Sequence, residues 1–124
     1  MTVKTGTSFD LEAFKSRYED WDIEALIGFY AEDVELIQVD RDNPPSSPRV
    51  RHGKEMFRGM FEHCAAAGVK VTVENTVAGG NRAAATITCE FPGGRKVLAN
   101  SILELEDGRI VRERDVLSGD QKQS

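Results

Sequence analysis

Few residues of the kind that build metal or disulfide sites occur in this sequence. It contains two cysteines and two histidines in 124 residues. Cys64 and Cys89 form no Cys-x-x-Cys pair, and no cluster of Cys, His and Asp has the spacing of metal ligands. We therefore expect no protein-built metal site. Both cysteines are expected to be buried, reduced thiols rather than partners in a disulfide or catalytic groups.

Positive charge and long apolar stretches are also scarce. Asp and Glu outnumber Lys and Arg by 21 to 16, which gives a net charge of −5. Nucleic acids and anionic membrane surfaces are bound through basic faces, so we expect neither as a partner. No apolar run approaches the length that crosses a bilayer, and residues 1–7 are too polar for a signal peptide. These absences predict a cytoplasmic protein.

Sequence patterns of covalent catalysis and phosphate binding are absent too. No Ser-His-Asp or Cys-His order indicates a nucleophile, and no helix follows the glycine pairs, which are typical of hairpin turns. The chain is 40% hydrophobic, and its length suits one domain with its own core. We expect a single domain over residues 1–124, with an ordered core over about 8–117 and a polar tail over 118–124.

Apolar residues at helical spacing predict two helices near the N-terminus. The first is expected to begin near Thr7 or Ser8, with Thr7 and Asp10 as a capping pair. Its apolar positions are Leu11, Phe14, Tyr18 and Trp21. The second is expected to begin at Asp22, a good N-cap residue. One face of this helix would carry Ile23, Leu26, Ile27 and Tyr30.

A third helix is predicted from about Gly53 to a glycine stop at Gly68. Its apolar stripe consists of Met56, Phe57, Met60, Phe61 and Cys64. Such a stripe usually belongs to a core, although Met and Phe side chains can also line an adaptable pocket. Before this helix, residues 34–40 are expected to form a strand. Residues 41–48 then form a proline-rich loop, either a solvated connection or the rim of a site.

The second half of the chain predicts four strands joined by hairpin turns. The expected strands are 69–78, 82–91, 95–106 and 109–117, and the last turn is the strong hairpin signal Asp107-Gly108. The predicted order is α-α-β-α-β-β-β-β. Helices first and antiparallel hairpins last indicate an α+β fold, with a curved antiparallel sheet packed on three helices.

The last predicted strand carries the best site candidate. Alternation puts Val111, Glu113, Asp115 and Leu117 on one face and Ile110, Arg112, Arg114 and Val116 on the other. Two carboxylates thus share a face and are bracketed by apolar residues. A carboxyl group among apolar walls has a raised pKa and can hold or take a proton near neutrality. The structural alternative is an Asp115 held by an arginine such as Arg49, Arg82 or Arg95.

Three segments together resemble the SnoaL-like proteins of the nuclear transport factor 2-like superfamily, which are relatives of polyketide cyclases. They are WDIEALIGFYAEDV at 21–34, HGKE at 52–55 and LELEDGRIVRERD at 103–115. With their order and spacing, the resemblance covers residues 8–117. It implies a cone-shaped fold, in which a curved sheet wraps around helices and leaves an apolar pocket. It also implies a homodimer formed through the outer face of the sheet.

The same resemblance suggests roles for single residues. Asp115 stands where the polyketide cyclases have an acid/base aspartate, and Glu113 stands where they have a histidine. Gln38 occupies the position of the ketosteroid isomerase base, which makes that mechanism unsuitable here. Ala84 and Thr86 replace the arginine and its partner aspartate of limonene epoxide hydrolase, so that arrangement is missing as well.

We therefore expect a protein that binds a small, largely apolar organic ligand without a metal or organic cofactor. As an isomerase, cyclase or lyase, it would transfer a proton through Asp115, helped by Glu113. The expected ligand-binding residues are Gln38, Phe14, Tyr18, Trp21, Met56, Met60, Thr86, Ser101 and Leu103. The alternative is a non-catalytic ligand-binding or association domain, whose pocket is small or filled by core side chains.

Overall fold

The computed structural model describes residues 9–120, which form three helices and six strands. Their bounds are α1 Leu11–Glu19, α2 Ile23–Ile27, β1 Tyr30–Val39, β2 Arg49–His52, α3 Lys54–Ala66, β3 Lys70–Gly79, β4 Arg82–Glu90, β5 Lys96–Glu106 and β6 Arg109–Gly119. The predicted α+β class is confirmed, and the order of elements differs from the prediction by one additional strand. The sequence pattern missed β2, a four-residue strand between the proline-rich loop and α3.

All six strands belong to one curved sheet in the order β2-β1-β6-β5-β4-β3. Strands β3 to β6 pair antiparallel through three hairpins, as predicted. Strand β1 instead pairs parallel with β6, so the sheet is not antiparallel throughout. The chain between these two strands contains β2, α3 and three further strands, and it is long enough to make the crossover that parallel pairing needs.

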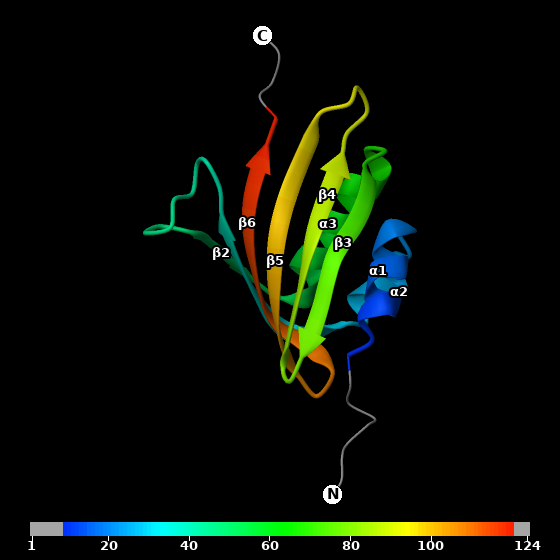
Figure 1. The fold of residues 1–124 in the computed structure, drawn as a ribbon, viewed down its shortest axis with the longest axis vertical. Coiled ribbons are helices and arrows are strands. Elements are labelled where there is room, and N and C mark those ends of the chain that lie inside the picture. The colour runs from blue at the N-terminus through cyan, green and yellow to red at the C-terminus, as the bar shows by residue number, and fades with distance from the viewer. Residues whose placement is uncertain (1–8, 121–124) are drawn as a thin grey trace, which may run out of the picture.

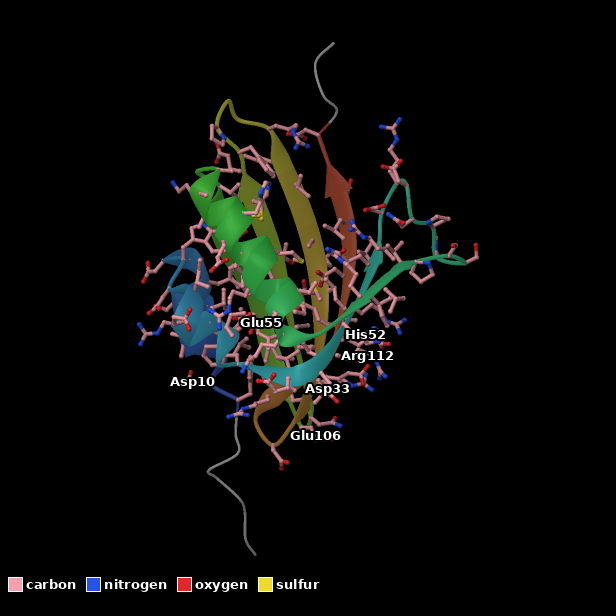
Figure 2. The ribbon with its side chains drawn as sticks, turned by 180° about the vertical axis from the view of Figure 1, so that it is seen from behind. Asp10, Asp33, His52, Glu55, Glu106 and Arg112 are labelled. Carbon is pink, nitrogen blue, oxygen red and sulfur yellow. The ribbon has the colours of Figure 1, made fainter. Side chains whose placement is uncertain are left out.

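The helices cover only the inner face of the sheet. Figure 2 shows α3 lying across this face, whereas Figure 1 shows the outer face without helices. The main core joins α1, α2 and α3 to the inner face through Phe14, Leu26, Ile27, Tyr30, Val34, Leu36, Phe57, Phe61, Ala83, Leu103 and Ile110. Burial of these side chains holds the layers together. A second cluster lies on β3, β4 and the residue before β3, and consists of Val69, Val71, Val73, Ala85 and Ile87.

The helix starts follow side-chain caps. The carboxylate of Asp10 accepts a backbone N–H bond, so α1 begins at Leu11 rather than near Thr7. Thr7 itself, with the predicted Thr7–Asp10 pair, lies outside the described residues. Asp22 caps α2 as predicted. This helix ends at Ile27, and Tyr30 begins β1 instead of completing the helical face.

Helix α1 also covers the open edge of the sheet at β3. The ammonium group of Lys15 donates to the Val73 carbonyl at 2.7 Å, and the Val73 N–H donates to the Glu19 carboxylate at 2.8 Å. Lys15 and Glu19 form an ion pair at 2.8 Å. Because β3 is the last strand of the sheet, these backbone groups have no neighbouring strand on that side. The two side chains supply the missing partners.

A β-bulge in β6 changes the predicted alternation. The pairing of β5 with β6 shifts after Glu104, which leaves Val111 as an extra residue without a cross-strand partner. Ile110 is therefore fully buried in the core and Val111 only partly buried, the reverse of the predicted faces. Beyond the bulge, the predicted alternation holds: Glu113 and Asp115 point inward.

Strand β6 runs further than the sequence pattern indicated. Ser118 and Gly119 pair with Leu98 and Val97 of β5, so the expected polar tail begins as strand. Residues 121–124 of that tail, like residue 8 at the expected start of the core, lie outside the described range.

Candidate functional site

Strand register brings three polar side chains into one row across the inner face. Gln38 on β1 lies beside Asp115 on β6, which lies opposite Ser101 on β5. The neighbouring row towards the C-terminal end of β6 is apolar and consists of Leu117, Ala99 and Ile87, followed by Val97 and Cys89. A single polar row therefore borders an apolar wall.

A cavity of about 190 Å³ lies between this wall and the helices. It is lined by Tyr18, Trp21, Gln38, Met60, Phe61, Cys64, Ile87, Cys89, Phe91, Val97, Ala99, Ser101, Asp115 and Leu117. A dry apolar cavity of about 150 Å³ is known to hold benzene, so this space suits a compact organic molecule. The structure thus brings together the predicted residues Tyr18, Trp21, Gln38, Met60, Ser101 and Asp115.

Other predicted ligand-binding residues lie elsewhere. Phe14 and Leu103 are fully buried in the main core, and Met56 packs against that core. Thr86 points to the outer face, where its hydroxyl contacts Asn75 and Asn100 at 3.2 and 2.8 Å. None of these four lines the cavity: Thr86 lies on the other face of the sheet, and the other three belong to the aromatic core that fills the inner face between Ile110 and the polar row.

Glu113 lies behind the cavity rather than in its wall. Its side chain is only 4% exposed, and the Tyr30 hydroxyl donates to its carboxylate at 3.1 Å. Burial raises the pKa of Glu113 well above its ordinary value, and the nearby charge of Asp115 raises it further. The bond from Tyr30 opposes this rise. Glu113 therefore favours the protonated form.

Asp115 is a buried carboxyl that reaches the cavity. It is 6% exposed, and burial raises its pKa, whereas the adjacent Glu113 and Ser101 oppose the rise. None of the three arginines considered from the sequence, Arg49, Arg82 and Arg95, forms an ion pair with it. Arg95 instead lies over the ring of Phe91, 4.7 Å from its centre.

The buried side-chain atoms of the described residues that lack a hydrogen bond lie in or beside the polar row. Within residues 9–120, the buried side-chain atoms without a hydrogen bond are Asp115 Oδ1, Ser101 Oγ and Arg51 Nε. Asp115 and Ser101 belong to the polar row, and Arg51 donates from Nη2 to Gln38 Oε1 at 2.8 Å. Buried polar groups are nearly always paired, so such a concentration indicates a place where a ligand or water completes the bonding.

Sequence reasoning missed two of the residues that shape the site. Arg51 comes from the unpredicted strand β2, and Tyr30 was assigned to a helix face. Cys64 and Cys89, expected to be buried, reduced thiols, are free thiols in the cavity wall, and both are only half-buried. Burial raises the pKa of both thiols, that of Cys89 to about 11. The helical stripe that grouped Cys64 with Met60 was the available signal for this wall.

Within residues 9–120, no three side chains of His, Cys, Asp or Glu come together as metal ligands would. The same part of the chain has no helix with both the length and the apolar character needed to cross a membrane.

The model of the SnoaL-like domain family matches residues 11–113. Among solved structures, a nuclear transport factor 2-like protein from Mesorhizobium loti has a TM-score of 0.71 at 21% identity, over 88% of each chain. One from Burkholderia xenovorans has a TM-score of 0.71 at 19% identity, over 92% of this chain and 84% of that chain. SalBIII, an epoxide hydrolase/cyclase-like enzyme in pyran ring formation, has a TM-score of 0.65 at 19% identity, over 87% of each chain. None of the curated proteins compared with the chain matches it.

Proposed function

The chain belongs to the SnoaL-like domain family, and we propose that it binds a small, largely apolar organic molecule in the 190 Å³ cavity and transfers a proton through Asp115. One observation carries this proposal: a buried Asp115 carboxyl, whose Oδ1 has no hydrogen-bond partner, reaches a largely apolar cavity beside Ser101 and Gln38. A carboxyl in such surroundings is a candidate acid or base with a pKa shifted towards neutrality.

The two neighbouring carboxyls suit this chemistry because they favour different protonation states. The more deeply buried Glu113 keeps a proton, and Asp115 is left as the base that faces the ligand. Asp115 would take a proton from a ligand carbon, and the electron pair of the broken C–H bond would move towards a ligand oxygen. Returning the proton to another atom completes an isomerisation, and the same base can start a cyclisation or an elimination.

Family relationship supports a small-molecule reaction and leaves its class open. SalBIII is described as acting in pyran ring formation, which is chemistry on an organic ligand. The polar row of this chain differs from that expected for ketosteroid isomerase, since the uncharged Gln38 stands where the resemblance places the base. Asp115 is the residue on which the proposal depends.

A binding protein without catalysis is the second candidate. It is favoured by the core side chains that fill much of the inner face and by the position of Glu113 outside the cavity wall. Both candidates predict ligand binding, and only the first predicts proton transfer.

Proton transfer can be tested without knowing the natural ligand. Acetophenone in D₂O exchanges its methyl protons when a base removes them, and NMR follows the loss of proton signal. We expect the wild-type protein to accelerate this exchange by about 100-fold or more, the range of positioned acid–base groups. Asp115→Asn should abolish the acceleration. The exposed Glu106→Gln is the matched control and should leave it unchanged.

Binding is measured separately by fluorescence, because Trp21 is the single tryptophan of the chain and lines the cavity. A wild-type protein that binds acetophenone without exchange would support the binding-only candidate. Equal exchange rates for wild type and Asp115→Asn would show that Asp115 is not the base.

We also propose that the protein forms a homodimer through the outer face of its sheet. The neighbouring strands β5 and β6 present the apolar side chains of Leu98, Ile102 and Val116 there, and these are 39, 47 and 53% exposed. No helix of residues 9–120 covers this face (Figure 1). A second copy of the chain would remove these side chains from water.

A further inference from the structure

One member of the polar row, Gln38, has its hydrogen-bonding direction fixed by Arg51, a residue that does not line the cavity. Arg51 donates from Nη2 to the Gln38 carbonyl oxygen at 2.8 Å. A guanidinium group has only donors, so the Gln38 side chain must turn its oxygen towards Arg51. Its NH₂ group then points to a different side, and it makes no hydrogen bond with any other residue of the described range.

Arg51 is held in place by its own surroundings. It lies on β2 opposite Leu36 of β1, one inward position away from Gln38. Its Nη2 also contacts Met60 Sδ of α3 at 3.3 Å, and its Nε is buried without a partner. The guanidinium therefore lies between β1 and α3, at the border of the cavity that Gln38 and Met60 both line.

We infer that Arg51 is a positioning residue, which fixes Gln38 as a hydrogen-bond donor to the cavity and so selects ligands that carry an acceptor oxygen beside Asp115. The inference rests on the proposed binding function. It adds a chemical class: a compact molecule of about one ring, with a carbonyl or other acceptor oxygen at one end. A ligand that places a donor against Gln38 would leave both that donor and the Gln38 NH₂ without an acceptor.

Two probes of the same shape test this selection. Acetophenone has an acceptor oxygen where α-methylstyrene has a CH₂ group, so the ratio of their dissociation constants isolates the hydrogen bond. Titration is followed by Trp21 fluorescence and checked by calorimetry. We expect the wild-type protein to prefer acetophenone by about tenfold, the value of one good hydrogen bond in a dry site.

Substitutions at Arg51 should remove the preference. Arg51→Met keeps the stem but allows the amide to rotate, and the ratio should fall to within about twofold. Gln38→Met should have the same effect. Arg51→Lys keeps the charge and can still donate to the Gln38 oxygen, so it should retain part of the preference. Arg109→Met is the control, because Arg109 is an exposed arginine at the start of β6, paired with Glu106 and away from Gln38, and its ratio should stay at the wild-type value.

The ratio separates positioning from a purely structural role. Loss of structural support would weaken both probes equally and leave the ratio unchanged. A folded Arg51→Met protein that keeps the tenfold preference would overturn the inference while leaving the binding function in place. If Arg51→Met does not fold, an unchanged ratio in Gln38→Met has the same meaning. A wild-type protein that binds neither probe would refute the binding function, and the inference would fall with it.

Discussion

Glu113 and Asp115 make the stability of this protein depend on pH in an unusual direction. Burial raises the pKa of both carboxyls above their ordinary values of 4.5 and 3.8. The folded state therefore binds their protons more tightly than the unfolded state does. Stability from these groups is fully present below the ordinary values and is lost as the pH rises towards the folded pKa values. Most salt-bridged carboxylates act in the opposite sense.

Glu113→Gln should reveal this effect. The amide imitates the protonated carboxyl: its oxygen can accept from Tyr30, and its NH₂ can face Asp115. We expect the variant to be more stable than wild type by about 1–2 kcal/mol at pH 8, because its neutral amide has no proton to lose, and similar to it near pH 4. Urea unfolding at several pH values measures this. A variant that is less stable by the same amount at every pH would contradict the prediction.

At the scale of elements, the contact of α1 with β3 protects the open edge of the sheet. Burial alone would raise the pKa of Glu19, but the bonds from Lys15 and the Val73 N–H lower it overall. A lowered pKa contributes stability above the ordinary value of 4.5, and this contribution is lost as the pH falls through the folded pKa.

Glu19→Gln should loosen this edge. We expect a loss of roughly 1 kcal/mol at pH 7, because one charged partner of a buried backbone group is replaced by a neutral one. Hydrogen exchange of the Val73 amide should become faster, and the loss of stability should shrink at acid pH. Glu74→Gln, at an exposed carboxylate on the same strand, provides the control. Unchanged Val73 exchange in Glu19→Gln would show that the helix does not protect the edge.

The bulge in β6 shows where side-chain alternation predicts the two faces of a strand correctly and where it fails. Alternation located Glu113 and Asp115 correctly on the inner face, because the strand is regular beyond the bulge. It failed at Ile110 and Val111, because one extra residue reverses the faces on its far side. A bulge depends on the fit of two strands, and a single strand's pattern carries little sign of it.

At the scale of the whole molecule, the proposed dimer depends on the outer face of the sheet. If Ile102 and Val116 pack against a second copy, the wild-type protein should elute at about twice its mass of 13.7 kDa. Ile102→Lys would place a charge in that contact and should give a monomer. Light scattering after size-exclusion chromatography measures both. Ala66→Lys, at an exposed alanine on α3 on the opposite side of the sheet, should stay dimeric, and a monomeric wild type would refute the dimer.

Local signals in the sequence were enough to predict where several helices and strands begin and end. The Asp22 cap, the Asp107-Gly108 turn and the glycine stop at Gly68 lie where the structure has them, because each depends on a few neighbouring residues. The family motifs joined these elements into the right fold class. The cavity wall was predicted in part, since Tyr18 and Met60 line it, whereas Phe14 fills the core.

Tertiary structure alone decided how the site is assembled. Gln38 meets Asp115 only because β1 pairs parallel with β6, across more than 70 residues of chain, and Arg51 reaches Gln38 only because β2 returns along β1. Side-chain periodicity tells which face a residue takes within its own strand. Which strands become neighbours, and which part of the inner face stays open, depends on how all the buried side chains pack together.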